Sequence, residues 1–130
     1  MTTQREIRSA DAPAPIGPYS QAIEAGGFVF CSGQIALDSN GQLNTGGVRA
    51  EAETALGNLV AVLAAAGCTP ADVVRTTIYL VDMGDFAVVN EAYGAVFATV
   101  PAPARATVAV AALPKGARVE IDATALSRRS

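Results

Sequence analysis

Two segments with the apolar spacing of a helix enclose one segment with the composition of a strand. Residues 85–99 have this spacing, and so do residues 48–66, where a single stripe is formed by Ala52, Leu56, Leu59, Val60 and Leu63. Pro101 and Pro103 prevent the later helix from continuing. Between the two helices, residues 73–81 are rich in the β-branched and aromatic side chains that favour a strand. This order indicates a chain of mixed helix and sheet.

Four further segments are predicted to be strands. The hairpin signal Gly26-Gly27 separates predicted strands at 21–25 and 28–34. A turn around Pro114-Lys115-Gly116 separates predicted strands at 105–111 and 118–126. The Pro-rich residues 10–18 are expected to be extended. The full order predicts an α+β fold, or a split βαβ pattern, with two helices on one face of a mixed sheet. The length predicts a single domain over residues 1–130.

Alternation along the strands leaves a second sheet face that is neither dry nor fully polar. The side chains expected to meet the helices are Ala106, Val108 and Val110 in one strand, Val119, Ile121 and Ala123 in the next, and Val74, Thr76, Ile78 and Leu80 in residues 73–81. Two helices, each about 10 Å wide, can cover only one face of such a sheet. The semi-apolar second face therefore predicts burial against another subunit, in a homo-oligomer.

The sequence contains no histidine, which limits the chemistry that the chain can perform. Serine–histidine and cysteine–histidine nucleophile pairs, imidazole acid–base catalysis and most zinc and non-haem iron sites are excluded. The glycine motifs that cradle phosphates or dinucleotides are also missing from the sequence. We therefore expect chemistry that runs on carboxylates, an arginine, a tyrosine, backbone groups and water, with no metal and no cofactor.

Charge and cysteine content restrict the expected partners and compartment. The net charge is -3 and aromatic residues make up 5%, so neither a basic stripe nor a stacking platform for nucleic acid is expected. No apolar run reaches membrane-spanning length, and no signal peptide is expected at the N-terminus. Cys31 and Cys68 are interpreted as core residues of a protein in a reducing compartment, the cytoplasm.

Two charged residues are candidates for the chemistry. Arg105 follows Pro101-Ala102-Pro103-Ala104, and a guanidinium among small, uncharged neighbours is a planar fork suited to a carboxylate. The alternative is a structural or interfacial ion pair at the start of a strand. Glu120 could act as a general acid or base or orient a water molecule, and its alternative is a salt-bridged glutamate on an edge strand. We expect the strands of Arg105 and Glu120 to be hairpin partners that face one region.

Three further residues are weaker candidates. Asn90 lies on the apolar side of the second predicted helix, where its amide would bind backbone at the helix–sheet junction or belong to a site at a subunit boundary. Tyr19 ends the Pro-rich segment, where it either packs or contributes to a site. Gly33 ends a strand and lets a ligand or another backbone approach closely.

Several motifs then occur together, in this order along the chain: Ile16-Gly17-Pro18-Tyr19-Ser20-Gln21-Ala22, Cys31-Ser32-Gly33-Gln34-Ile35, Val89-Asn90-Glu91-Ala92-Tyr93, Pro103-Ala104-Arg105 and Leu113-Pro114-Lys115-Gly116-Ala117-Arg118-Val119-Glu120-Ile121. They resemble the RidA (YjgF) family of reactive-intermediate deaminases over nearly the whole chain. The resemblance implies a chorismate-mutase-like fold and a homotrimer whose sheets line a central barrel, with active sites between subunits. It also implies cofactor-independent hydrolysis of 2-imino acids, such as 2-iminobutanoate and 2-iminopropanoate or their enamine tautomers, to 2-keto acids and ammonia.

The same resemblance assigns roles to residues. It implies that Arg105 anchors the substrate carboxylate and that Glu120 handles water, while Tyr19, Gly33 and Asn90 shape the cleft. Well-studied members have cysteine where this chain has Thr107, so Thr107 is expected to bind substrate in a pocket whose substrate preference the sequence leaves open.

Three other functions fit the same motifs. The first is a trimer that binds small carboxylic acids, or acts as a chaperone, without turnover. The second is a ribonuclease or translation inhibitor, although the acidic chain without histidine gives little reason to expect an RNA cleft. The third is a different deaminase or hydrolase on the same scaffold.

Overall fold

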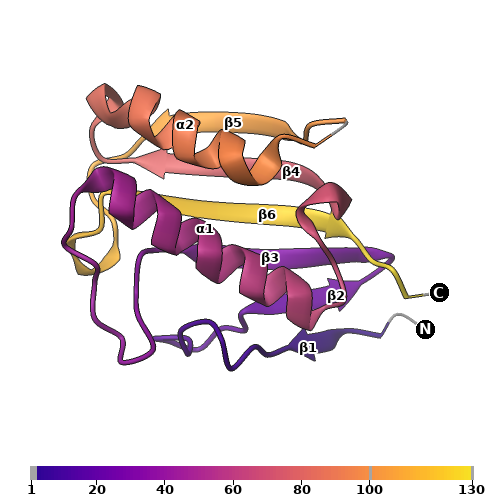
Figure 1. Cartoon of the computed structure of the whole chain (residues 1–130). Helices are drawn as coiled ribbons and strands as arrows, with labels where there is room; N and C mark the ends of the chain where they lie inside the picture. Colours follow the sequence, from indigo (N-terminus) through magenta and orange to yellow (C-terminus); the bar gives the residue numbers. More distant parts are fainter. Residues whose placement is uncertain (1–2, 100, 130) are drawn as a thin grey trace.

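The computed structural model describes residues 3–99 and 101–129, which form a six-stranded sheet with two helices on one face (Figure 1). The strands are β1 (Arg5–Ile7), β2 (Ala22–Ala25), β3 (Phe28–Gln34), β4 (Val73–Leu80), β5 (Ala104–Ala109) and β6 (Val119–Leu126). The helices are α1 (Val48–Ala65) and α2 (Phe86–Phe97), and three short 3-10 turns are η1 (Pro70–Asp72), η2 (Met83–Asp85) and η3 (Pro114–Gly116). The predicted α+β fold with a mixed sheet is therefore confirmed.

The strands lie in the order β1-β2-β3-β6-β4-β5. Only the β4–β5 pair is parallel among the strand pairs of the described chain, and α2 forms the crossover between these two strands. Strand β1 was not predicted, because three residues are too few to show a period in the sequence. It joins the edge through pairing with β2, next to a salt bridge between Arg5 and Glu24.

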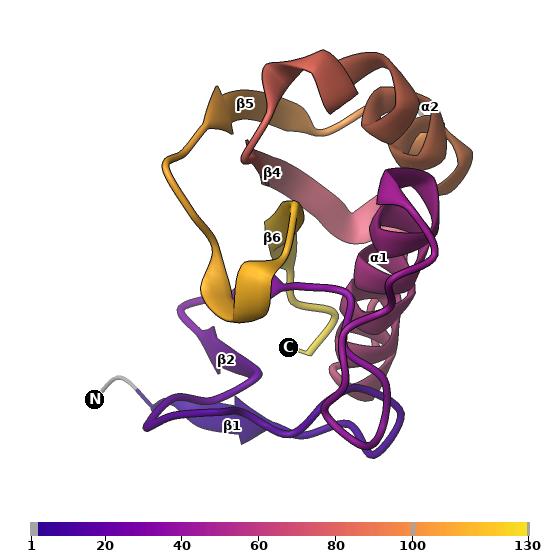
Figure 2. The same cartoon turned by 90° about the vertical axis from the view of Figure 1, so that its left-hand side faces the viewer.

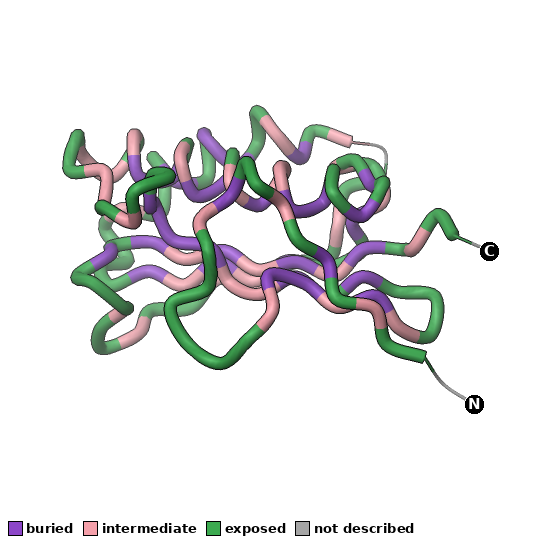
Figure 3. Tube along the Cα trace, turned by 90° about the horizontal axis from the view of Figure 1, so that it is seen from below, coloured by how far each residue is buried: buried purple, intermediate pink, exposed green. Residues whose placement is uncertain are grey.

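The core lies between the helices and one sheet face. Figure 2 shows both helices on the same side of the sheet, and Figure 3 shows the buried residues gathered between the layers. The largest fully buried side chains include Leu56, Leu59 and Leu63 of α1 and Val119 and Ile121 of β6. The predicted inward set of β6 is thus confirmed, and so is the predicted stripe of α1 except at Val60, which is only partly buried.

The predicted orientation of β5 is wrong. Its register pairs Arg105 with Thr76 and Thr107 with Ile78, and both β4 partners are buried under the helices. Arg105 and Thr107 therefore lie on the helix side, whereas Val108 is exposed on the other face. The physical reason is that β5 is an edge strand. Pairing with β4 determines which of its side chains face the helices, and the apolar or polar character of those side chains does not.

Two further predictions about these strands are corrected. The strands of Arg105 and Glu120 are not hairpin partners, because β4 lies between β5 and β6. In β4, an irregular register between Val73 and Arg75 turns Val73 inward and leaves Val74 exposed.

An ion pair between an exposed arginine and a buried carboxylate fixes the start of β6 against α1. Glu51 in the first turn of α1 is buried, and its carboxylate accepts hydrogen bonds from the backbone N–H of Arg118 at 3.0 Å and from Arg118 Nε at 2.8 Å. This contact fixes the position of the residue two places before Glu120.

In the part of the chain that the structure describes, neither helix is both long and apolar enough to cross a membrane.

Candidate active site

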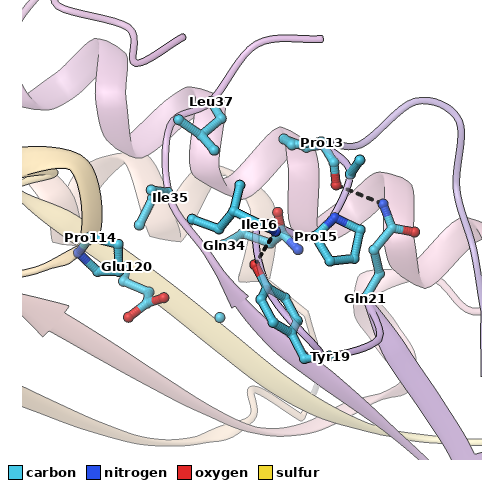
Figure 4. Close-up of a pocket in the computed structure, with 12 residues that line it drawn as sticks. Pro13, Pro15, Ile16, Tyr19, Gln21, Gln34, Ile35, Leu37, Pro114 and Glu120 are labelled. Atoms are coloured by element: carbon cyan, nitrogen blue, oxygen red, sulfur yellow. Dashed lines mark hydrogen bonds between the residues drawn. The ribbon is translucent and has the colours of Figure 1, made fainter. Parts of the chain in front are cut away.

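Three of the predicted site residues line one cavity at the end of the sheet face that the helices leave uncovered. Tyr19, Gly33 and Glu120 come from the N-terminal segment, β3 and β6, and surround a volume of about 40 Å³ (Figure 4). The rest of the wall is mostly apolar and includes Pro13, Pro15, Ile16, Ile35, Leu37 and Pro114. A carboxyl group therefore faces a small space with largely apolar sides.

A close approach between strands explains glycine at position 33. A Cβ atom there would lie 2.7 Å from Glu120 Oε2 and 2.9 Å from Glu120 Cγ. The register of the β3–β6 pair shifts between Cys31 and Gln34, next to this contact. Gly33 does permit a close approach, but the approaching group is the Glu120 side chain and not the predicted ligand or backbone.

Glu120 is half-buried and stands in the middle of the sheet. Strand β6 is a central strand, and no salt bridge of the described residues includes Glu120. The alternative interpretation, that Glu120 is a salt-bridged glutamate on an edge strand, is therefore wrong. Burial raises the pKa of Glu120, and the negative charge of Asp122 raises this pKa further. Such a carboxyl group carries a proton at a higher pH than an ordinary glutamate does.

Tyr19 stands at the mouth of the cavity. Its side chain is 47% exposed, and its hydroxyl accepts a hydrogen bond from the Ile16 backbone N–H at 3.3 Å. The alternative that Tyr19 is a packing residue is therefore not supported. Its phenol is available to a molecule in the cavity.

Gln21, which the sequence did not single out, holds the Pro-rich wall in place. Its buried side chain donates from Nε2 to the carbonyl oxygens of Pro13 at 2.8 Å and Ser9 at 3.2 Å, and its Oε1 accepts the Ser9 N–H at 2.7 Å. These bonds attach residues 9–13 to the start of β2. A buried glutamine beside a strand was the available signal, but the partners of an amide cannot be read from the sequence.

Arg105 and Asn90 form a second group on the helix side of the sheet. Arg105 Nη1 donates to Asn90 Oδ1 at 2.7 Å, and the guanidinium carbon lies 4.9 Å from the ring centroid of Tyr93 and 5.7 Å from that of Phe86. No carboxylate forms a salt bridge with Arg105 in residues 3–99 and 101–129, so the structural ion pair is not observed within this chain. The guanidinium retains N–H groups that an anion can bind.

The prediction of a buried amide at Asn90 is wrong. Asn90 is exposed, because it lies on the side of α2 that passes over the edge strand rather than over the core. Its carbonyl oxygen orients Arg105 instead of binding backbone.

Thr107 lies on the same side of β5 as Arg105, one pleat further along the strand. Its hydroxyl is the one buried side-chain polar atom of the described residues that has no hydrogen-bond partner. A buried hydroxyl without a partner is unusual, which distinguishes Thr107 from the other buried polar side chains described.

One chain does not bring the two groups together. Arg105, Asn90 and Thr107 lie on the helix side at the β5 edge, whereas Tyr19, Gly33 and Glu120 lie at the other face, with β4 between β5 and β6. Over the described parts of the chain, no cluster of three or more His, Cys, Asp or Glu side chains could hold a metal ion.

Comparison with known proteins decides the family. The family model described as endoribonuclease L-PSP matches residues 9–127. The chain belongs to this family. A mouse protein named 2-iminobutanoate/2-iminopropanoate deaminase is 52% identical to the chain over 124 residues, which are 95% of this chain and 91% of the mouse protein.

Two solved structures share the fold and confirm the predicted RidA resemblance. RidA from the Antarctic bacterium Psychrobacter is 43% identical, with a TM-score of 0.89 over 94% of this chain and 98% of that one. The structure of E. coli TdcF with bound serine is 38% identical, with a TM-score of 0.88 over 97% of this chain and 99% of that one.

Proposed function

We propose that the protein hydrolyses small 2-imino acids, such as 2-iminobutanoate and 2-iminopropanoate, or their enamine tautomers, to 2-keto acids and ammonia without a cofactor. The observation that carries the proposal is the guanidinium of Arg105, which is oriented by Asn90 and forms no salt bridge within the described chain. It fits the carboxylate that every such substrate carries. The mouse deaminase and the serine-bound TdcF support the same substrate class.

The proposal includes a homotrimer whose active sites lie between subunits. Since Arg105 and Glu120 face opposite sides of one sheet, a site that uses both needs two copies of the chain. An interface that joins one face to a different face can repeat around a closed ring. The number of three copies is what the RidA resemblance implies. Exposed Phe28, Phe30 and Leu126 on the uncovered sheet face support its burial against other sheets in a central barrel.

The chemistry follows from this arrangement. The Arg105 fork of one copy binds the substrate carboxylate and fixes the orientation of the C=N bond. Glu120 of the next copy positions a water molecule, whose oxygen bonds to the imine carbon while the nitrogen gains a proton. In the resulting carbinolamine the hydroxyl proton is transferred to the amino nitrogen, and the C–N bond breaks with its electron pair going to nitrogen, which releases ammonia and leaves the 2-keto acid.

The cavity beside Glu120 suits a small apolar substituent. Its volume of about 40 Å³ and its wall of Ile16, Ile35, Leu37 and Pro114 leave room for a short alkyl group of the substrate. Thr107 lies on the side of the carboxylate anchor, so we expect it to influence which substrates are preferred.

The two cysteines take no part in this chemistry. Both are free and buried, and burial raises the pKa of the Cys31 thiol to about 12. A thiol that stays protonated is a poor nucleophile. Two free buried thiols are typical of a reducing compartment, and we propose the cytoplasm.

The proposal is tested by generating 2-iminobutanoate from threonine with a dehydratase and timing the appearance of 2-ketobutyrate. Arg105→Ala is expected to lower kcat/KM by at least about 100-fold, which corresponds to about 2.7 kcal/mol. The matched control is Arg49→Ala, which removes an exposed arginine paired with Glu91 on the helix layer and should leave the rate unchanged. Near-wild-type rates in Arg105→Ala would refute the assignment.

The runner-up is a carboxylate-binding trimer without turnover. Capture of an anion does not need the second carboxyl group that Glu120 provides, and for this reason we favour hydrolysis. Saturable binding of 2-ketobutyrate with no acceleration of imine hydrolysis would favour the runner-up. Salt-dependent RNA binding would favour a ribonuclease, to which the acidic pair Glu120 and Asp122 on the uncovered face is poorly suited.

A further inference from the structure

A second carboxylate stands next to Glu120 and is held by two hydrogen bonds. Asp122 follows Glu120 by two residues in β6, so the two side chains share the uncovered sheet face. Tyr79 Oη donates to Asp122 Oδ2 at 3.0 Å, and the backbone N–H of Thr77 donates to Asp122 Oδ1 at 3.1 Å. No salt bridge of the described residues involves Asp122. The carboxylate of Asp122 is therefore fixed in position on the face that carries Glu120.

The other groups around Glu120 do not oppose this charge. From β4, Tyr79 is the cross-strand partner of Glu120, and from the N-terminal segment, Tyr19 shares its cavity. Strand β3 contributes Gly33 and the uncharged Gln34. Of the nearby cations, Arg118 binds Glu51 and Lys115 of η3 donates to the Gly41 carbonyl oxygen. Arg75 of β4 shares the uncovered face, opposite Thr124, and forms no salt bridge with Asp122 or Glu120 among the described residues.

We propose that Asp122, held by Tyr79 and Thr77, is a positioning residue that keeps Glu120 in its proton-carrying form, so that Glu120 donates a proton to the nitrogen of the bound imine. This inference rests on the function proposed above and adds a role to the same site. The proton passes from the Glu120 carboxyl group to nitrogen as the water oxygen bonds to carbon. The carboxylate left behind accepts a proton from that water, so protons and charge balance and Glu120 is restored.

Distance and burial determine the size of the effect. Residues two apart in a strand lie about 7 Å apart along it. At this separation, on a partly buried sheet face, the repulsion between the two carboxylates is only partly screened, so the charge of Asp122 raises the pKa of Glu120. Burial of Glu120 acts in the same direction, and the Arg105 of a second copy would act in the opposite one.

The test combines an NMR titration of the Glu120 carboxyl group, which needs no substrate, with the pH dependence of imine hydrolysis. Protein labelled with ¹³C at the glutamate carboxyl group is titrated by NMR, and Glu120→Gln identifies the Glu120 signal by its loss. The same variants are assayed for 2-iminobutanoate hydrolysis across pH. Asp122→Asn keeps the size and removes the charge. Its amide oxygen can still accept from the Thr77 N–H, and its NH2 group can donate to Tyr79 Oη, which then becomes the acceptor. Tyr79→Phe keeps the charge and removes one hydrogen bond.

We expect Asp122→Asn to move the Glu120 titration to lower pH by roughly one unit, together with the alkaline limb of kcat/KM, and to lower kcat/KM about tenfold above that limb. Tyr79→Phe should move the Glu120 titration and the alkaline limb of kcat/KM by less than half as much. The control Glu53→Gln, which removes a carboxylate from the helix layer on the other side of the sheet, should move neither.

A Glu120 titration that stays unchanged in Asp122→Asn would overturn the inference. So would an equal shift in Tyr79→Phe, because packing and not charge would then control the titration. The NMR titration does not need turnover, so a shifted titration in a protein without imine hydrolysis would refute the proposed function and leave the charge effect established. A shifted titration with an unmoved kinetic limb would show that Glu120 is not the proton donor.

Discussion

Replacing Gly33 with alanine is expected to slow imine hydrolysis by about 100-fold while leaving the fold intact. The new Cβ would meet Glu120 Oε2 at 2.7 Å, Cδ at 2.8 Å and Cγ at 2.9 Å, whereas ordinary van der Waals contact begins at 3.4 Å. The carboxyl group must therefore retreat by roughly 0.7 Å or more. A displacement of about 1 Å in a reacting group costs about 100-fold in rate.

The loss should be in kcat more than in KM, because Arg105 still binds the substrate carboxylate. The cost in stability should be at most about 1–2 kcal/mol, since the backbone at position 33 lies outside the left-handed region and the side chain that must move borders a cavity. Steady-state kinetics and thermal unfolding of the same preparation measure both effects.

Gly57→Ala is the matched control. Gly57 is exposed in α1, and a Cβ there meets nothing within 4 Å. This variant should gain about 0.5–1 kcal/mol of stability with an unchanged rate. If Gly33→Ala keeps a rate within about twofold of wild type, the Glu120 carboxyl group is not positioned by this contact and the reasoning fails.

Two further predictions concern stability. Because burial and Asp122 raise the pKa of Glu120 in the folded state, its contribution to stability is present below its ordinary value of 4.5 and is lost as pH rises; Glu120→Gln should therefore raise the unfolding temperature at about pH 7 and not at about pH 4. Thr76 Oγ1 and Tyr93 Oη share a buried hydrogen bond of 2.8 Å, so Thr76→Val and Tyr93→Phe should each cost about 1–2 kcal/mol and the double variant clearly less than their sum. Additive costs in urea unfolding would show that the bond contributes nothing.

The sequence was sufficient to predict the two helices and to predict which side chains of the central strand β6 face the core. The stripe of α1 and the alternation around Val119 and Ile121 are strong signals, because both elements bury one face against the same core. The resemblance to the family motifs also helped to locate the candidate site, since three residues that it singled out, Tyr19, Gly33 and Glu120, line one cavity.

The orientation and neighbours of β5 could not be predicted in this way. Alternation divides its residues into two sets, but it does not show which set meets the helices when the strand lies at an edge. Arg105 lies on the helix side because the register of β5 on β4 pairs it with the buried Thr76, and this parallel pairing depends on the crossover through α2. The contact between Gly33 and Glu120 joins residues far apart in sequence, so no local pattern could reveal it.

The central claim is that each active site combines Arg105 of one chain with Glu120 of another. The most direct test mixes two inactive variants, Arg105→Ala and Glu120→Gln, after subunit exchange that is verified by mass spectrometry. In a ring of randomly mixed subunits, about one quarter of the sites would regain both intact groups, so the mixture should recover about one quarter of wild-type activity. A fully exchanged mixture that shows only the residual rates of the two variants would contradict the shared site.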